Sequence, residues 1–162
     1  MKIFKDSNGR EWKVVITVET VKRVRSLCGV NLLDAVKFEE NGVKADLIDR
    51  ISNDPVLLVD IMYCICRPQA EAEKVSDVDF GEHMTGDTVE AATDALLEEL
   101  VNFFPEAKKK ILRLILESAK RLKAQANRTV DELIASGKFQ QEIDRMEKNA
   151  SESFTSSPAS AE

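Results

Sequence analysis

The sequence predicts a mainly α fold: a helical bundle-like single domain with a small N-terminal β-hairpin and a disordered C-terminal tail. The chain has 162 residues, of which 43% are hydrophobic and 32% charged, and this suits one globular domain. Apolar residues recur at three- and four-residue steps along most of it. Six glycines and four prolines are too few for a fold built from many tight turns.

Residues 1–17 are predicted to form the hairpin. Asn8-Gly9 supplies the positive φ angles that a tight turn requires, and β-branched or aromatic residues fill much of the run that follows. Because a two-stranded hairpin is marginal alone in water, we expect it to pack on the next helix. That helix carries valines and a leucine at three-residue steps and is predicted to stop at Gly29.

Residues 30–53 allow two interpretations. Asn41-Gly42 can close a second hairpin between Ala35–Glu39 and Val43–Ala45, or it can link two helices. Apolar residues from 47 to 51 indicate a short helix that ends near Asn53. We favour helices throughout this segment.

A central core helix is predicted from Asp54 onward. Asp54 is a good N-cap, and Pro55 occupies the first helical position, where its missing N–H costs nothing. The helix is apolar nearly all round, which is typical of a helix enclosed by others. Pro68 is expected to end or kink it, and residues 69–75 are expected to form a polar connector.

Two capping boxes are predicted next. Ser76 with Asp79 opens a short helix, and Asp87 with Glu90 opens a longer one that ends at Phe104-Pro105. Residues 105–136 then form a long basic, amphipathic helical segment, as one helix or two. Gly137 marks a stop, and one or two further amphipathic turns follow. The predicted domain covers residues 1–148 and the tail residues 149–162.

The cysteines and the N-terminus both indicate a cytoplasmic protein. Cys28, Cys64 and Cys66 have no metal-binding spacing, and we expect ordinary core thiols in a reducing compartment. The N-terminal residues lack the apolar run of a secretory leader. The longest apolar stretch, residues 56–66, is far shorter than the ~20 residues of a membrane span.

The net charge of −6 hides a partition along the chain. Residues 1–30 carry +4, residues 31–104 carry −12, residues 105–128 carry +6 and residues 129–162 carry −4. The basic segment could bind nucleic acid by neutralising phosphates, but it holds no aromatic side chain for base stacking, and the acidic flank would repel a polyanion. A solvated or internally paired helix face and a docking face for a partner helix are the other readings.

We find no pattern that predicts catalysis or metal binding. His83 is the single histidine and is expected at a helix end, and no Gly-rich phosphate loop or nucleophile elbow is present. The carboxylates between 77 and 90 lack the spacing of a calcium loop. We therefore expect a non-enzymatic protein without cofactor or metal; an enzyme would have to depend on His83 and these carboxylates.

An ordered set of segments gives the chain a family resemblance. These segments are Phe4-x-Asp6-x-x-Gly9-x-x-Trp12, Gly29-Val30-Asn31-Leu32-Leu33-Asp34, Asp54-Pro55, Val75-Ser76-Asp77-Val78-Asp79-Phe80, Gly86-Asp87 and Phe103-Phe104-Pro105. In this order the chain resembles the small, mostly helical tail assembly chaperones of long-tailed bacteriophages and prophages, over roughly residues 1–120 and in its Ser/Ala/Pro/Glu-rich tail.

The resemblance implies a non-enzymatic protein that acts in the host cytoplasm and is absent from the mature virion. Such chaperones coat and solubilise the hydrophobic tape measure protein and help tail tube subunits assemble around it. Many occur as a short form and a frameshifted long form, and this chain would be the short form. Self-association is a further option, and no membrane contact is implied. The alternative function is a nucleic-acid-associated adaptor or regulator that uses the basic helix 108–128.

A partner helix would need an apolar groove with a charged rim. The candidate partner-binding residues combine both kinds of side chain, although apolar residues of this kind more often belong to the core. They are Phe103, Phe104, Lys108, Lys109, Leu112, Arg113, Leu116, Lys120, Arg121, Phe139 and Met146.

Overall fold

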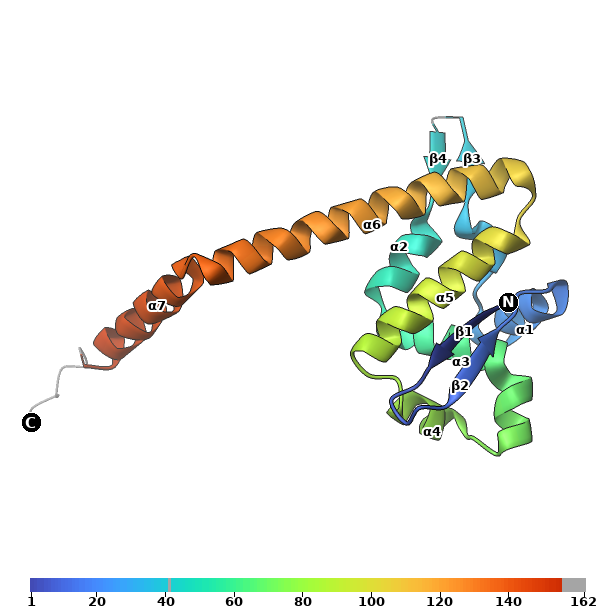
Figure 1. Cartoon of the computed structure of the whole chain (residues 1–162), viewed down its shortest axis with the longest axis horizontal. Helices are drawn as coiled ribbons and strands as arrows, with labels where there is room; N and C mark the ends of the chain where they lie inside the picture. The colour runs from blue at the N-terminus through green and yellow to red at the C-terminus, as the bar shows by residue number, and fades with distance from the viewer. Residues whose placement is uncertain (41, 156–162) are drawn as a thin grey trace, which may run out of the picture. The chain divides into compact units, whose positions relative to one another are not determined.

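The computed structural model describes residues 1–40 and 42–155 and confirms a mainly α fold with an N-terminal hairpin (Figure 1). The chain divides into two compact units, Met1–Leu116 and Glu117–Glu162. Helix α6 (Glu106–Ala135) begins in the first unit and continues into the second, which also holds α7 (Lys138–Thr155). The preceding elements are β1 (Lys2–Lys5), β2 (Glu11–Val14), α1 (Val18–Cys28), the 3₁₀ helix η1 (Leu32–Ala35), β3 (Lys37–Glu39), β4 (Gly42–Lys44), α2 (Asp46–Asn53), α3 (Pro55–Glu73), α4 (Asp77–Glu82) and α5 (Asp87–Phe103).

The predicted N-terminal hairpin is present, and a buried carboxylate closes it. Strands β1 and β2 pair antiparallel, and Gly9 adopts a φ of 81° in the turn between them. The Asp6 carboxylate accepts hydrogen bonds from the backbone N–H groups of Asn8 at 3.0 Å and Arg10 at 2.9 Å, and from Trp12 Nε1 at 2.9 Å. These three donors satisfy a carboxylate that water hardly reaches.

The hairpin packs mainly between α3 and α5, whereas we expected it to pack on α1. Strand β1 lies along α5 and β2 along α3 (Figure 1). Trp12 is fully buried and meets the edge of the Phe80 ring at a centroid distance of 4.8 Å. The Gln69 side chain accepts from the Lys13 N–H at 3.1 Å and donates to the Glu11 carbonyl at 2.7 Å. The long α3 and α5 surfaces therefore cover this sheet.

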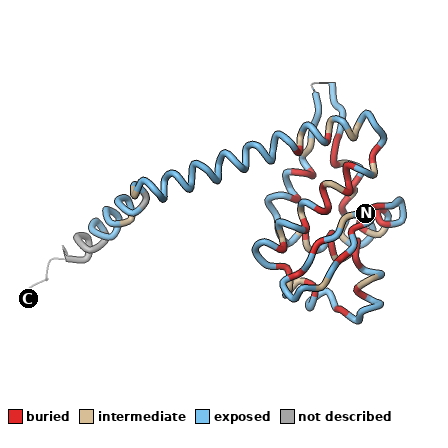
Figure 2. Tube along the Cα trace, viewed as in Figure 1, coloured by how far each residue is buried: buried red, intermediate tan, exposed pale blue. Residues whose placement is uncertain are grey.

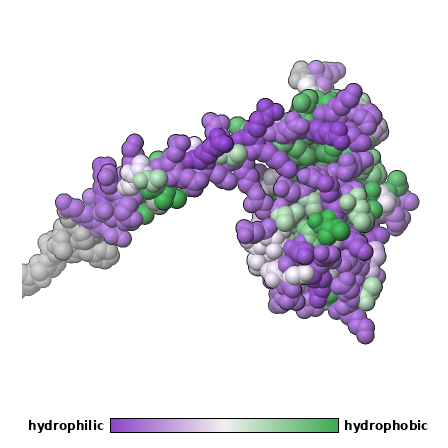
Figure 3. Space-filling model, in the orientation of Figure 1, coloured by the Kyte–Doolittle hydropathy of each residue, from purple (hydrophilic) through white to green (hydrophobic). Residues whose placement is uncertain are grey.

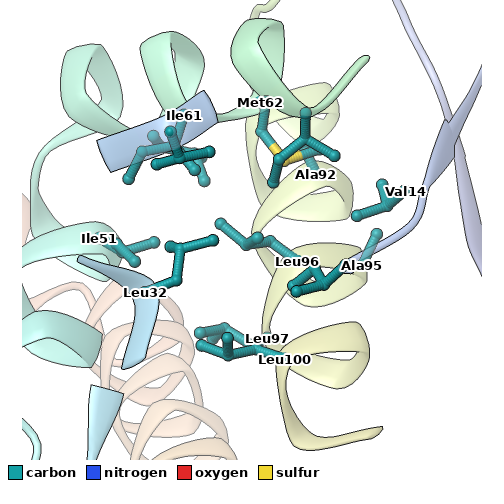
Figure 4. Close-up of a cluster of buried hydrophobic side chains, with 14 of the residues drawn as sticks. Val14, Leu32, Ile51, Ile61, Met62, Ala92, Ala95, Leu96, Leu97 and Leu100 are labelled. Carbon is teal, nitrogen blue, oxygen red and sulfur yellow. The ribbon is translucent and has the colours of Figure 1, made fainter. Parts of the chain in front are cut away.

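Helix α3 is the centre of the first unit, as predicted. It contacts α1, α2, α4, α5 and β2 and buries residues on several of its faces. Ile61 and Met62 face Leu96 of α5 in a cluster that Leu32 and Ile51 complete (Figure 4). The buried residues gather in this unit (Figure 2).

The predicted end of this helix at Pro68 is wrong, because α3 runs unbroken to Glu73. A proline inside a helix removes the N–H that would bond to the carbonyl four residues earlier. That carbonyl belongs to Cys64, and it accepts a hydrogen bond from Arg23 Nη1 of α1 at 3.2 Å. The next residue of the helix, Gln69, is held by its side-chain hydrogen bonds to the backbone of β2. Tertiary contacts thus compensate for the missing bond.

The preference for helices throughout residues 30–53 is also wrong, and the hairpin alternative is present. Strands β3 and β4 pair antiparallel, with Phe38 opposite Val43, and Lys44 Nζ lies 2.6 Å from Glu39 Oε2. Gly42 has a φ of 134°, which a helix cannot contain. The short helix predicted to end near Asn53 is α2.

The helix starts agree with the predicted caps at two positions out of three. Asp54 caps α3, and Ser76 and Asp79 form the capping box of α4, in which the Ser76 hydroxyl and N–H lower the pKa of the Asp79 carboxyl. The Asp87 box is wrong. Gly86 occupies the cap position with a φ of 44° and makes no side-chain cap bond, so Asp87 is already the first helical residue.

Residues 106–135 form one helix, which settles the choice between one and two. Gly137, at a φ of 67°, ends this region as predicted. Helix α7 is longer than the expected turn or two and continues to Thr155, seven residues into the predicted tail. Once a helix exists, each added residue gains one backbone bond without a new nucleus, so the weak formers after 148 can extend it. The rest of the tail, 156–162, lies outside the described residues.

Candidate partner-binding surface

The first part of α6 is anchored in the core of the first unit. Leu112 and Leu116 are buried, and Ile111 and Ile115 are packed against the same core. Ile111 and Ile115 are four residues apart, as are Leu112 and Leu116, so the two neighbouring rows form one broad face of the helix. This face is the predicted apolar side of the basic helix, and the protein itself already covers it.

The two phenylalanines before α6 belong to the same anchor. Phe104 is buried and Phe103 is partly buried, with their rings edge to face at a centroid distance of 5.7 Å. The Lys108 ammonium lies 5.2 Å from the centroid of the Phe104 ring, a cation–π contact. Phe104, Leu112 and Leu116 were predicted as partner-binding residues, and the structure places them in the core, where no partner can reach them.

The basic side chains lie mainly on the solvent side of α6. Lys109 Nζ lies 3.3 Å from Glu106 Oε1, and Arg121 Nη2 lies 3.7 Å from Glu117 Oε2, so both pair within their own helix. Such exposed pairs contribute little to stability. Arg113 and Lys120 are exposed. These two side chains are therefore accessible from solvent.

Beyond Leu116 the helix is exposed on every side. All residues from 117 to 136 are exposed, including Leu122 at 68% and Val130 at 52% (Figure 2). Steps of three or four residues place five apolar residues on one face, and we call this face the exposed stripe. It consists of Ala119, Leu122, Ala126, Val130 and Leu133.

Helix α7 adds further apolar groups to this part of the chain. Met146 is 62% exposed and Ile143 is partly buried. The side chain of Phe139, another predicted partner-binding residue, lies outside the described residues. The space-filling view shows green hydrophobic patches between the purple polar surfaces of α6 and α7 (Figure 3). Among the predicted apolar site residues whose side chains the structure describes, Met146 is the most accessible.

The exposed stripe itself was missed as a site. The sequence periodicity from residue 111 to 133 includes it, and this signal indicates an apolar face. Periodicity does not tell which turns of that face the protein covers. The prediction selected Leu112 and Leu116, which are buried, and passed over Leu122, Val130 and Leu133, which are exposed.

No metal site appears among the described residues, since no three His, Cys, Asp or Glu side chains converge there. His83 ends α4, as expected, and its Nδ1 lies 3.5 Å from Ser7 Oγ. The Ser7 N–H also donates to the His83 carbonyl at 3.1 Å. These contacts connect the hairpin turn to the end of α4, so His83 contributes to the packing of these two elements.

All three cysteines are free thiols, and the two in α3 have different neighbours. Cys64 faces Cys28 of α1, whereas the Cys66 thiol points toward the Lys13 carbonyl of β2 at 3.8 Å. Burial raises the pKa of the Cys66 thiol to about 12. Cys64 and Cys66 thus point toward different neighbours of α3.

Comparisons with known proteins do not assign the chain to a family. No protein-family model, curated protein or solved structure matches this chain. Within the part of the chain that the structure describes, no helix is long and apolar enough to cross a membrane.

Proposed function

We propose that this protein is a non-enzymatic phage tail assembly chaperone whose exposed stripe holds a helical, apolar segment of the tape measure protein. The observation that supports this most is the run of exposed residues in α6 from 117 to 136. In folded proteins the packing of an apolar face supplies most helical stability, and the side chains of this run lie in water. A partner helix laid on the stripe supplies that packing.

The chemistry of the stripe suits such a partner. Leucine and valine side chains separated by alanines form a shallow apolar surface, into which the apolar face of another helix can fit. The basic residues on the other sides of α6 stay in water and keep the bound pair soluble. The acidic first unit adds like charge between complexes, so it opposes their aggregation.

The rest of the role comes from the family resemblance. The protein would keep the tape measure protein soluble in the host cytoplasm, recruit tail tube subunits and leave before the virion is complete. Its first unit would act as the folded body that anchors α6 through Leu112 and Leu116.

Co-expression with the tape measure protein of the same genome tests the proposal. We expect the wild-type chain to bring that partner into the soluble fraction as a recoverable complex. A triple variant, Leu122→Gln, Val130→Gln and Leu133→Gln, should weaken the complex about a hundredfold, because three apolar contacts are lost. Its own unfolding midpoint should stay unchanged, since all three side chains are exposed.

A matched control carries polar changes on the opposite side of α6. Ala124→Gln and Asp131→Asn lie about half a helical turn away from the stripe and should leave the complex intact. An insoluble tape measure protein, or a complex that the triple variant forms equally well, would contradict the proposal. Binding to duplex DNA at low salt that is lost when Lys108, Lys109, Lys110 and Arg113 become alanine would favour the nucleic-acid alternative instead.

A further inference from the structure

Two thiols from different helices meet in the first unit. Cys28 is the last residue of α1 and Cys64 lies in the middle of α3, yet their sulfur atoms are 2.9 Å apart. This is closer than two sulfur atoms approach without bonding or sharing a proton. The two residues are separated by 36 positions in the sequence, so the fold alone brings them together.

The packing of α1 on α3 holds both sulfur atoms in place. Val21 and Val24 bury the inner face of α1, and Arg23 donates to the Cys64 carbonyl at 3.2 Å. The Cys28 sulfur also lies 3.5 Å from the Asp60 carbonyl, one turn before Cys64. Gly29 then ends α1 in a left-handed conformation. Little movement is needed to bring the sulfur atoms to bonding distance.

Solvent reaches mainly one of the two thiols. Cys28 is partly exposed at the end of its helix, whereas Cys64 is buried behind it. A small reagent can therefore reach Cys28 first, and Cys64 is placed to attack from within. Cys66 is buried on another side of α3 and has no cysteine beside it, so it serves as an internal reference.

We propose that Cys28 and Cys64 form a reversible intramolecular disulfide by exchange with a small-molecule disulfide such as oxidised glutathione. The Cys28 thiol loses its proton to solvent, and its sulfur attacks one reagent sulfur, which releases one reagent thiol and leaves a mixed disulfide. Cys64 then loses its proton and attacks the Cys28 sulfur, which releases the second reagent thiol. Two protein thiols are oxidised, and one reagent disulfide is reduced.

The reduced pair is inert at neutral pH. Burial, and then the hydrogen bond with Cys64, raise the pKa of the Cys28 thiol to about 12. Exchange needs the thiolate, so the first step is slow. The pair therefore stays reduced in a reducing compartment and closes only after long exposure to an oxidising medium. Closure links α1 to α3 and constrains the unfolded chain between them.

Incubation of the purified full chain with oxidised glutathione tests the inference. The number of thiols in the denatured protein should fall from three to one, and peptide mapping should find Cys28 joined to Cys64. The Tm should rise by roughly 10 °C and return to its first value after reduction. A Cys66→Ala variant should lose both of its thiols and show the same rise.

Several outcomes would overturn the inference. They are three thiols that persist after prolonged incubation, a stable mixed disulfide on Cys28, or disulfide-linked dimers in place of the intramolecular bond. Cys28→Ser is the matched negative control: it should keep both remaining thiols and show no rise in Tm. Because the wild-type thiol count and peptide map suffice by themselves, poor folding of a variant does not affect the conclusion.

Discussion

Asp6 shows how much one side chain contributes to this fold. Its carboxylate is buried at the hairpin turn and accepts three hydrogen bonds, one of them from the fully buried Trp12. Removing the acceptor leaves buried donors without a partner, which costs more than the bonds themselves contribute. Trp12 in turn packs on Phe80, so losing its hydrogen bond to Asp6 also weakens the packing of the hairpin on α4.

Asp6→Ala is therefore expected to lower the free energy of unfolding by about 3 kcal/mol, measured by urea denaturation. Glu40→Ala removes an exposed carboxylate near the turn after β3. This substitution should change the free energy of unfolding by less than about 0.5 kcal/mol. Equal effects of the two substitutions would contradict the role given to Asp6.

The buried Cys66 thiol makes stability depend on alkaline pH. Its pKa is about 12 in the folded chain and 9.0 as the ordinary value, so the folded state favours the neutral thiol. The contribution of this thiol is complete below pH 9 and is lost as the pH rises toward 12. The loss approaches about 1.4 kcal/mol per pH unit inside this window.

Denaturant midpoints at pH 7, 9 and 10.5 measure this effect. The wild type should lose more stability between pH 9 and 10.5 than Cys66→Ala does, because the alanine variant lacks the group that titrates. Identical pH profiles would show that Cys66 ionises without cost. The cavity left by the alanine lowers stability at every pH and does not alter the comparison.

At the scale of elements, local signals predicted the starts and stops of helices well. A capping residue bonds to backbone groups only a few positions away, so its effect can be predicted from the local sequence. The structure confirms the predicted caps at Asp54, at Ser76 with Asp79, and at Gly29. The predicted helix end at Pro68 was wrong because contacts with residues distant in the sequence determine the structure there. Helix α3 passes through Pro68 because Arg23 comes from another helix to satisfy the Cys64 carbonyl. No local pattern around Pro68 contains that information.

Arg23 and Pro68 are therefore expected to be coupled. Arg23→Ala should destabilise the protein by about 1–2 kcal/mol, since it leaves the Cys64 carbonyl without its donor. Adding Pro68→Ala should recover most of this loss, because the new N–H can bond to the same carbonyl. A double-mutant cycle by urea denaturation measures the coupling, and strict additivity would contradict the explanation.

At the scale of the whole molecule, the sequence predicted an apolar, basic helix but not where it is covered. Ile111 to Leu116 are shielded by the first unit, whereas Leu122 to Leu133 continue the same periodicity in water. The difference depends on where the neighbouring helices end, which periodicity does not encode. Most of the predicted residues lie in the same helix as the exposed stripe, but several of the apolar ones lie in turns that the core already covers.

The charge partition also belongs to this scale. The −12 of residues 31–104 lies within the first unit, and the +6 of residues 105–128 lies on α6. A partner that binds the exposed stripe therefore meets lysines and arginines at its edges. We expect added salt to slow association more than it speeds dissociation, because rim charges act mainly on the rate of encounter.

The most direct test of the account is hydrogen exchange along α6, measured with and without the tape measure protein. Amides of residues 117–136 should exchange quickly in the free chain, because the side chains of these turns are exposed. Binding should slow exchange there at least tenfold and leave residues 111–116 nearly unchanged. A complex that forms while residues 117–136 keep exchanging quickly would contradict the claim that the exposed stripe holds the partner.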